Sequence, residues 1–120
     1  MRSPPPSSRL PALLVLVLTI TLAACQPSHP EQRAADVAPV AADRVTAKDL
    51  RFQPAAVKVP AGTTVTWSFE DGRVPHNVKG DDFASRNLTR GTFTHTFAQP
   101  GEYRYTCTLH AGMDGRVVVG

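Results

Sequence analysis

Apolar and polar residues alternate in short runs from Val45 to the C-terminus, and this alternation constrains the fold more than any other feature. Side chains of a β-strand point alternately to its two faces, so each run predicts a strand with one buried face. The turn-forming sequences P-A-G, E-D-G and Q-P-G separate the runs. The pattern predicts an all-β sandwich or barrel of about 75 residues, spanning 45–120. The residues expected on inward faces are Val65, Trp67, Phe69, Phe93, His95, Phe97, Tyr103, Tyr105 and Cys107.

The N-terminus has the three parts of an export signal. Arg2 and Arg9 precede an uncharged apolar run, Leu10 to Ala24, which ends in small residues. The run is 15 residues long, whereas a transmembrane helix needs about 20 apolar residues. Residues 1–24 are therefore predicted to be a signal peptide, and a permanent membrane-spanning helix is the weaker alternative.

Cys25 follows this run in the sequence L-A-A-C, which resembles the lipobox of bacterial lipoproteins. Acylation of such a cysteine anchors a protein to a membrane, so a cell-envelope location facing the periplasm or the exterior is expected. The alternative is ordinary cleavage nearby, which leaves Cys25 as a free thiol. Residues 26–44 are rich in Pro and Ala and have no periodic apolar pattern. Residues 25–44 are therefore expected to form a lipidated N-terminus and a flexible tether.

The charge of the chain argues against one class of partner. Without Arg2 and Arg9, Lys and Arg fall from 13 to 11, against 10 Asp and Glu, so the mature net charge is near +1. The sequence has no basic run with interleaved aromatic residues, which excludes a nucleic-acid-binding protein. A monomer with protein partners is expected.

The chain has two cysteines, and they cannot form a disulfide with each other if Cys25 carries lipid. Cys107 then has no partner, and an unpaired thiol outside the cytoplasm is prone to oxidation. A bound metal would protect it. A small domain also gains stability from a metal, since little apolar area is buried at this size.

Three soft ligands lie close together in the loop CTLHAGM (107–113), with the spacing C-x₂-H-x₂-M. A fourth is available in VPHNV (74–78), where His76 follows a proline. Two imidazoles, a thiolate and a thioether favour copper in an electron-transfer site. Thioether is a poor ligand for zinc, which makes a zinc site the weaker alternative.

Six short motifs follow one another through the part of the chain that is expected to fold. They are F-x-P (52–54), V-x-V-P-A-G (57–62), T-V-T-W (64–67), P-H-N-V (75–78), G-E-Y-x-Y-x-C (101–107) and M-x-G-x-V-x-V (113–119). With these motifs the sequence resembles the plastocyanin-like cupredoxins over about 70 residues, essentially the whole folded part. The short gap between His110 and Met113 resembles the amicyanin loop. The resemblance implies a Greek-key β-sandwich or barrel of about seven or eight strands, and one mononuclear type 1 copper.

The resemblance also implies a role for each site residue. It assigns His76, Cys107 and His110 as equatorial copper ligands and Met113 as the axial ligand. Asn77 is expected to donate its backbone N–H to the Cys107 sulfur and to bridge the ligand loops through its side chain.

Three other residues are expected to lie outside the ligand set. His29 belongs to the tether, and His95 has no family ligand position, so His95 is expected to be structural. Phe69 stands where many relatives have an Asn, in a loop (TWSFEDGRVPH) one residue longer than theirs. The hydrogen bonds of that Asn near the site are therefore not expected here.

The function implied is a membrane-tethered blue-copper protein that shuttles single electrons between Cu(II) and Cu(I) states. By family analogy its partners are a cytochrome c or a copper-containing oxidase or reductase. The alternative is an extracytoplasmic copper-handling protein, although the mature chain has one Met. An enzyme is not expected, because Thr106 and Thr108 flank Cys107 where a multicopper oxidase needs histidines.

Overall fold

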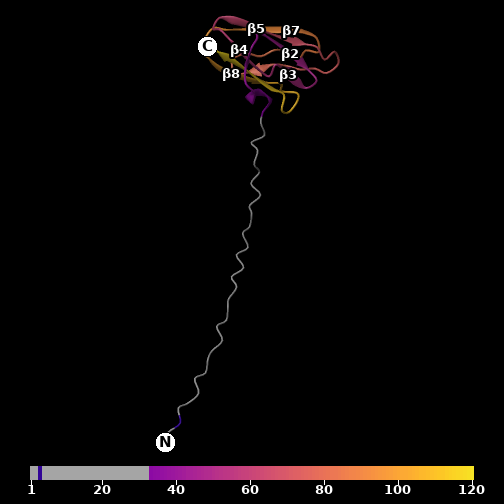
Figure 1. Ribbon diagram of the computed structural model, residues 1–120. Helices are drawn as coiled ribbons and strands as arrows, with labels where there is room; N and C mark the ends of the chain where they lie inside the picture. The colour runs from indigo at the N-terminus through magenta and orange to yellow at the C-terminus, as the bar shows by residue number, and fades with distance from the viewer. Residues whose placement is uncertain (1–2, 4–32) are drawn as a thin grey trace.

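The computed structural model describes residue 3 and residues 33–120, and its strands form two layers (Figure 1). A five-stranded sheet has the order β1-β4-β9-β8-β6, and a four-stranded sheet has the order β3-β2-β5-β7. A short 3₁₀ helix, η1 (Ala34–Asp36), precedes the strands. These are β1 (Val40–Ala41), β2 (Arg44–Lys48), β3 (Arg51–Gln53), β4 (Ala56–Val59), β5 (Thr63–Phe69), β6 (Lys79–Gly80), β7 (Gly91–Phe97), β8 (Gly101–Thr106) and β9 (Asp114–Val119).

The alternation of apolar residues becomes the inner faces of the two sheets, which confirms the predicted all-β sandwich. In β5, Val65, Trp67 and Phe69 are buried while the residues between them are less so. The described residues hold nine strands, more than the seven or eight expected, and two of them, β1 and β6, have only two residues. Parallel pairing of β2 with β5 and of β4 with β9 connects strands that are distant in sequence.

Aromatic side chains fill the core around Trp67, which is 0% exposed. The Trp67 ring packs edge-on against Tyr105 at 5.3 Å between centroids, and stacks on Phe83 at 5.9 Å. Tyr105 is opposite Gly115 in the β8–β9 register, and a Cβ at that position would collide with the Tyr105 ring. A glycine in β9 therefore makes room for an aromatic residue in β8.

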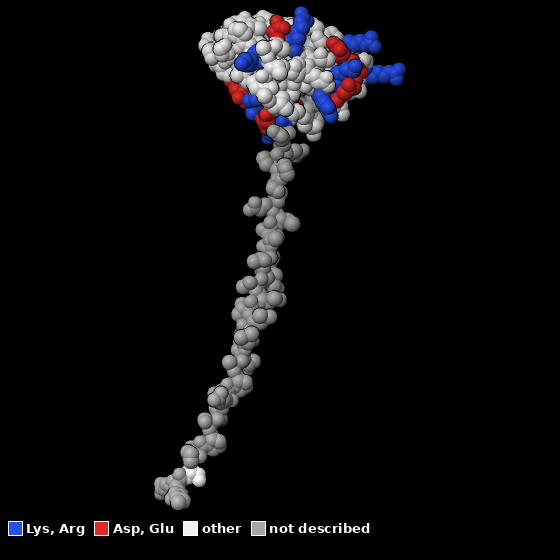
Figure 2. All heavy atoms as spheres, in the orientation of Figure 1, with Lys and Arg blue, Asp and Glu red and all other residues white. Residues whose placement is uncertain are grey.

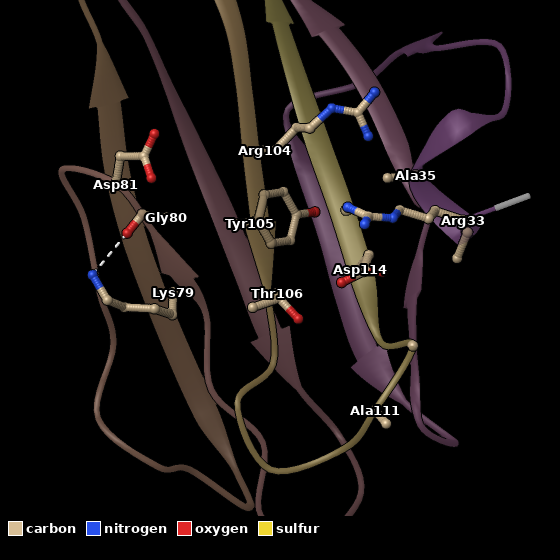
Figure 3. A pocket seen from close by; sticks show the side chains of 13 residues that line it. Arg33, Ala35, Lys79, Gly80, Asp81, Arg104, Tyr105, Thr106, Ala111 and Asp114 are labelled. Atoms are coloured by element: carbon tan, nitrogen blue, oxygen red, sulfur yellow. Dashed lines mark hydrogen bonds between the residues drawn. The ribbon is translucent and has the colours of Figure 1, made fainter. Parts of the chain in front are cut away.

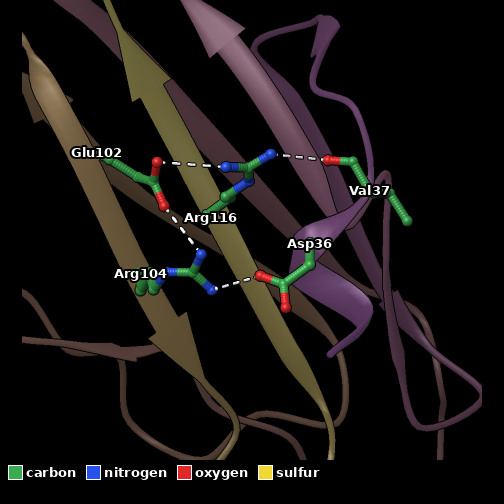
Figure 4. Close-up of polar contacts among 5 residues, drawn as sticks. All are labelled: Asp36, Val37, Glu102, Arg104 and Arg116. Atoms are coloured by element: carbon green, nitrogen blue, oxygen red, sulfur yellow. Dashed lines mark hydrogen bonds and ion pairs between the residues drawn. The ribbon is translucent and has the colours of Figure 1, made fainter. Parts of the chain in front are cut away.

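The structured part of the chain begins earlier than the expected boundary at residue 45. Ala35 in η1 is 1% exposed, and β1 pairs in parallel with β4. Figure 4 shows how the segment 33–41 is held: Arg104 Nη1 donates to Asp36 Oδ1 at 2.9 Å, and Arg116 Nη2 donates to the Val37 carbonyl at 2.8 Å. This docking was not predicted from the sequence, because the docking depends on one buried alanine and on polar contacts to distant strands.

The predicted signal peptide, Cys25 and His29 lie outside the described residues. No helix in the described part of the chain has the length and hydropathy required to span a membrane. On the face shown in Figure 2, acidic and basic side chains lie next to one another.

Candidate metal centre

The pairing of β6 with β8 brings two distant loops to the same end of the sandwich. Lys79 in β6 is opposite Thr106 in β8. His76 lies three residues before Lys79, and Cys107 directly follows Thr106, so strand pairing places the two side chains close together. The ligand atoms of His76, Cys107 and His110 all lie within 4.8 Å of one another. The structure therefore brings together three of the four predicted ligands.

The burial of these residues suits a metal bound at the edge of a core. His76 is 0% exposed and Cys107 2%, whereas His110 is partly exposed. Cys107 is a free cysteine, with no disulfide partner among the described residues. The thiol and one imidazole are thus shielded from water, while the other imidazole reaches the surface.

Backbone hydrogen bonds close the loop that carries Cys107, His110 and Met113. Cys107 N donates to Met113 O at 2.8 Å, and Met113 N donates to His110 O at 3.3 Å. Gly112 has a φ of +80°, a conformation that favours glycine and lets the loop turn back. Met113 is 1% exposed, so its thioether is buried in the same loop. Its role as axial ligand stays a prediction.

His76 uses one ring nitrogen for a carboxylate and leaves the other without a protein partner. Nε2 lies 2.7 Å from Asp71 Oδ2, and the buried Nδ1 has no hydrogen-bond partner. The hydrogen bond from His76, with a second from the Asp49 backbone N–H, holds the pKa of Asp71 below its usual value. Because an ionised carboxylate can only accept, Nε2 carries a proton, and in the neutral imidazole Nδ1 then has a free lone pair.

His110 is oriented in a similar way by a neutral acceptor. Its Nε2 lies 3.0 Å from the carbonyl oxygen of Pro75, which can only accept a hydrogen bond. Nδ1 of His110 is then also the unprotonated nitrogen. The two rings meet edge to face with centroids 4.9 Å apart.

Asn77 joins the two loops at both its backbone and its side chain. Its backbone N–H donates to Cys107 Sγ at 3.5 Å. Its side chain donates to Thr108 Oγ1 at 2.7 Å and accepts from Thr108 N at 2.8 Å, and it also donates to Asn87 at 2.8 Å. The bond to Cys107 and the side-chain bridge to Thr108 are the contacts expected of Asn77 from the sequence, and they tie the position of the sulfur to the His76 loop.

The residues present fit a copper ion that is bound by two imidazoles and one thiolate. The buried, unpartnered Nδ1 of His76 is costly unless a ligand occupies it. A His₂Cys set is typical of electron-transfer copper, and a structural zinc site needs four strong ligands. Within the described residues, this is the group of three metal-ligating side chains that lies close enough to hold an ion.

Two of the residues that the sequence analysis placed outside the ligand set, His95 and Phe69, lie outside the metal centre. His95 stacks on Phe83 with centroids 4.7 Å apart, and it is not part of the ligand group. Phe69 is 3% exposed and belongs to the core. Asp71 was not predicted from the sequence, and the one signal that pointed to it was the extra residue in the loop between Trp67 and His76.

A separate cavity of about 1130 Å³ lies beside the metal centre, on the outer side of β6, β8 and β9 (Figure 3). Arg33 and Ala35 of the docked N-terminal segment line one wall, and Ala111 and Gly112 of the ligand loop line another. Two of the three cations that line it have partners: Arg104 binds Asp36, and Lys79 Nζ donates to the Gly80 carbonyl at 2.8 Å. The cavity does not contain the three clustered ligands.

The chain matches one family model and is similar to several known proteins and solved structures. A family model, the cupredoxin-like domain, matches residues 13–119. Amicyanin-alpha from Methylorubrum extorquens is 33% identical over 90 residues, which covers 68% of this chain and 75% of that protein. The structure of a purple cupredoxin from Nitrosopumilus maritimus has a TM-score of 0.61 and 30% identity, covering 66% of this chain and all of that one. A copper-containing nitrite reductase from Thermus scotoductus SA-01 has a TM-score of 0.54 and 26% identity, over 70% of this chain and 23% of that one.

Proposed function

The chain belongs to the family of proteins with a cupredoxin-like domain, and on this premise we propose that it is a type 1 copper protein that carries single electrons between redox partners. The observation that carries the proposal is the cluster of His76, Cys107 and His110, whose ligand atoms lie within 4.8 Å of one another. Bound copper would supply the redox chemistry, one electron at a time, between its Cu(II) and Cu(I) states.

The protein contributes a donor set that is held in place before the metal binds. Asn77 fixes the Cys107 loop, and the Cys107–Met113 backbone bond closes it. Burial of His76 and Cys107 excludes water from one side of the centre. A rigid and dry donor set changes little between two oxidation states, which keeps the reorganisation energy low.

Electrons would enter and leave through His110, which is the partly exposed ligand. Leu109 beside it is 41% exposed, and Ala111 and Gly112 are exposed as well. This apolar surface suits the small and transient interface of a redox encounter. A cytochrome c or a copper-containing oxidase or reductase is the proposed class of partner.

The proposal is for an electron carrier and not for an enzyme. Thr106 and Thr108 flank Cys107, whereas a trinuclear copper cluster requires histidines there. The match to the nitrite reductase covers 23% of that chain. The copper-loaded protein is expected to show no turnover of nitrite or dioxygen beyond that of free copper.

An absorption and EPR spectrum of the copper-loaded protein tests the proposal. We expect an intense visible band from thiolate-to-Cu(II) charge transfer and a narrow copper hyperfine splitting, both lost in Cys107→Ser. His95→Gln is the matched control, because His95 stacks on Phe83 outside the cluster, and it should keep both signals. A colourless copper-loaded wild type would disprove the proposal. Rapid loss of copper to a chelator, without electron self-exchange, would favour copper handling instead.

Membrane tethering through Cys25 is part of the same proposal, and it is supported by the L-A-A-C sequence after an apolar run. Mass spectrometry of the protein from membranes is expected to find an acylated Cys25 as the N-terminus. Cys25→Ser should move the protein from the membrane fraction to the soluble fraction. An unacylated Cys25 in the wild-type protein would refute the anchor and leave the copper proposal intact.

A further inference from the structure

Asp71 is a charged residue at the metal centre that the ligand assignment does not use. It lies in the loop between β5 and β6, five residues before His76. Its side chain is 17% exposed, and its Oδ2 accepts the hydrogen bond from the fully buried His76 ring at 2.7 Å. A short bond between a carboxylate and a buried imidazole restricts the ring more than a contact with water would.

Several contacts hold the Asp71 carboxylate in this position. The same Oδ2 accepts the backbone N–H of Asp49 at 3.0 Å, which links it to the turn between β2 and β3. On the other side, Gly72 N donates to Thr89 O at 3.1 Å, and Val74 N donates to Asp71 O at 3.4 Å. The carboxylate is therefore fixed by the fold and does not depend on His76 alone for its orientation.

The contact determines which nitrogen of His76 is available for a metal. A neutral imidazole has two tautomers, and the acceptor at Nε2 selects the one with an unprotonated Nδ1. That nitrogen is buried and has no protein partner, and His76 is one of the three residues of the cluster with Cys107 and His110. The hydrogen bond thus prepares the donor atom before any ion is present.

The two histidines of the cluster differ in the charge of their acceptors. His110 donates to the neutral carbonyl of Pro75, whereas His76 donates to a carboxylate. A carboxylate makes the imidazole a stronger donor to the metal, and its negative charge stabilises the more positive oxidation state. Lys48 lies near Asp71 and partly offsets this charge.

We propose that Asp71 is the positioning residue of His76: it fixes the Nε2–H tautomer, and its charge lowers the reduction potential of the copper bound at Nδ1. The statement on potential rests on the proposed function, whereas the statement on the tautomer concerns the metal-free protein. Asp71 lies in the loop between Trp67 and His76, which is one residue longer than in relatives. It makes a hydrogen bond near the site that the buried, apolar Phe69 cannot make.

The first test is the tautomer of His76 in the metal-free protein, from the ¹⁵N chemical shifts of its ring. Wild type and Asp71→Asn are expected to show Nε2–H, because the amide oxygen of Asn still accepts. Asp71→Ala is expected to show a tautomer mixture. An Nδ1–H ring in the wild type, or an unchanged Nε2–H ring in a folded Asp71→Ala, would overturn the positioning role.

The second test is the reduction potential of the copper-loaded Asp71→Asn protein. Removing the charge is expected to shift the relative affinity for Cu(I) over Cu(II) by about tenfold, a rise in potential of about 59 mV. Asp43→Asn is the matched control, because it removes the same charge from an exposed residue next to the opposite end of β2. A potential for Asp71→Asn equal to that of the control would overturn the charge effect. A wild-type protein without a blue copper signal would instead refute the proposed function, and the tautomer result would still stand.

Discussion

The backbone N–H of Asn77 donates a hydrogen bond to the sulfur of Cys107 at 3.5 Å, across a separation of 30 residues. The Asn77 side chain adds a reciprocal pair of hydrogen bonds with Thr108, the next residue after the cysteine. One residue of the His76 loop therefore sets the position of the thiol loop. The metal centre is thus built from contacts between loops that lie far apart in the sequence.

Asn77→Ala removes the side-chain link between the two loops. Three hydrogen bonds are lost, at about 1 kcal/mol each, so we expect the metal-free protein to lose about 2–3 kcal/mol of unfolding free energy in urea. Copper should also dissociate faster, because the Cys107 loop is no longer held. Asn87→Ala is the control, since it removes only one of the three bonds and should cost about 1 kcal/mol. Equal losses for the two variants would contradict the linking role.

Met113→Leu tests whether the buried thioether is the axial ligand. Leu and Met have similar volumes, so the unfolding free energy of the metal-free protein should fall by less than about 1.5 kcal/mol. The copper-loaded variant should nevertheless have an altered visible spectrum and a higher potential, because a thioether donor to Cu(II) is gone. A spectrum and potential identical to wild type would show that Met113 only fills the core.

The docked segment 33–41 is expected to loosen in acid. The hydrogen bond from Arg104 lowers the pKa of Asp36 below its usual 3.8. A carboxyl group whose pKa is lowered by folding stabilises the folded form at any pH above the pKa of the unfolded state. This stabilisation is lost as the pH falls through the lower pKa of the folded state. Hydrogen exchange should therefore show protection of 33–41 near neutral pH and less below about pH 3.8.

Asp36→Asn provides the matched test of that pH dependence. The variant should exchange faster at neutral pH and respond little to acid, because it has no carboxylate to protonate. The effect should be small and sensitive to salt, since both partners are partly exposed. Unchanged protection in the variant would show that burial of Ala35, and not the ion pair, holds the segment.

Leu109→Ser tests the surface proposed for partner docking. Leu109 is 41% exposed next to His110, so its loss should slow electron self-exchange by about tenfold, or about 1.4 kcal/mol, without changing the potential. Val40→Ser is the control, because Val40 is similarly exposed, at 48%, but lies in β1 at the edge of the sheet. Equal effects of both variants on the NMR-measured rate would contradict a docking role for Leu109.

Local patterns were sufficient to predict the sandwich and the crowded C-terminal loop. The alternation in β5 places Trp67 and Phe69 in the core, because successive side chains of any strand point to opposite faces. Cys107, His110 and Met113 are close in sequence, so their proximity requires only a tight loop. Strand counts and ends were less predictable, since two-residue strands such as β1 and β6 carry almost no periodic signal.

The family resemblance implied that His76 and Asn77 join that loop, and the pairing of β6 with β8 is what brings His76 to Cys107. Only the tertiary structure decided that the loop conformation directs Asp71 to the Nε2 of His76. The docking of 33–41 depends in the same way on Arg104 and Arg116 of other strands. These contacts depend on strand order and loop geometry, which local periodicity does not encode. The sequence by itself therefore determined the strands and the donor-rich loop, and long-range hydrogen bonding decided the charge and orientation around the metal centre.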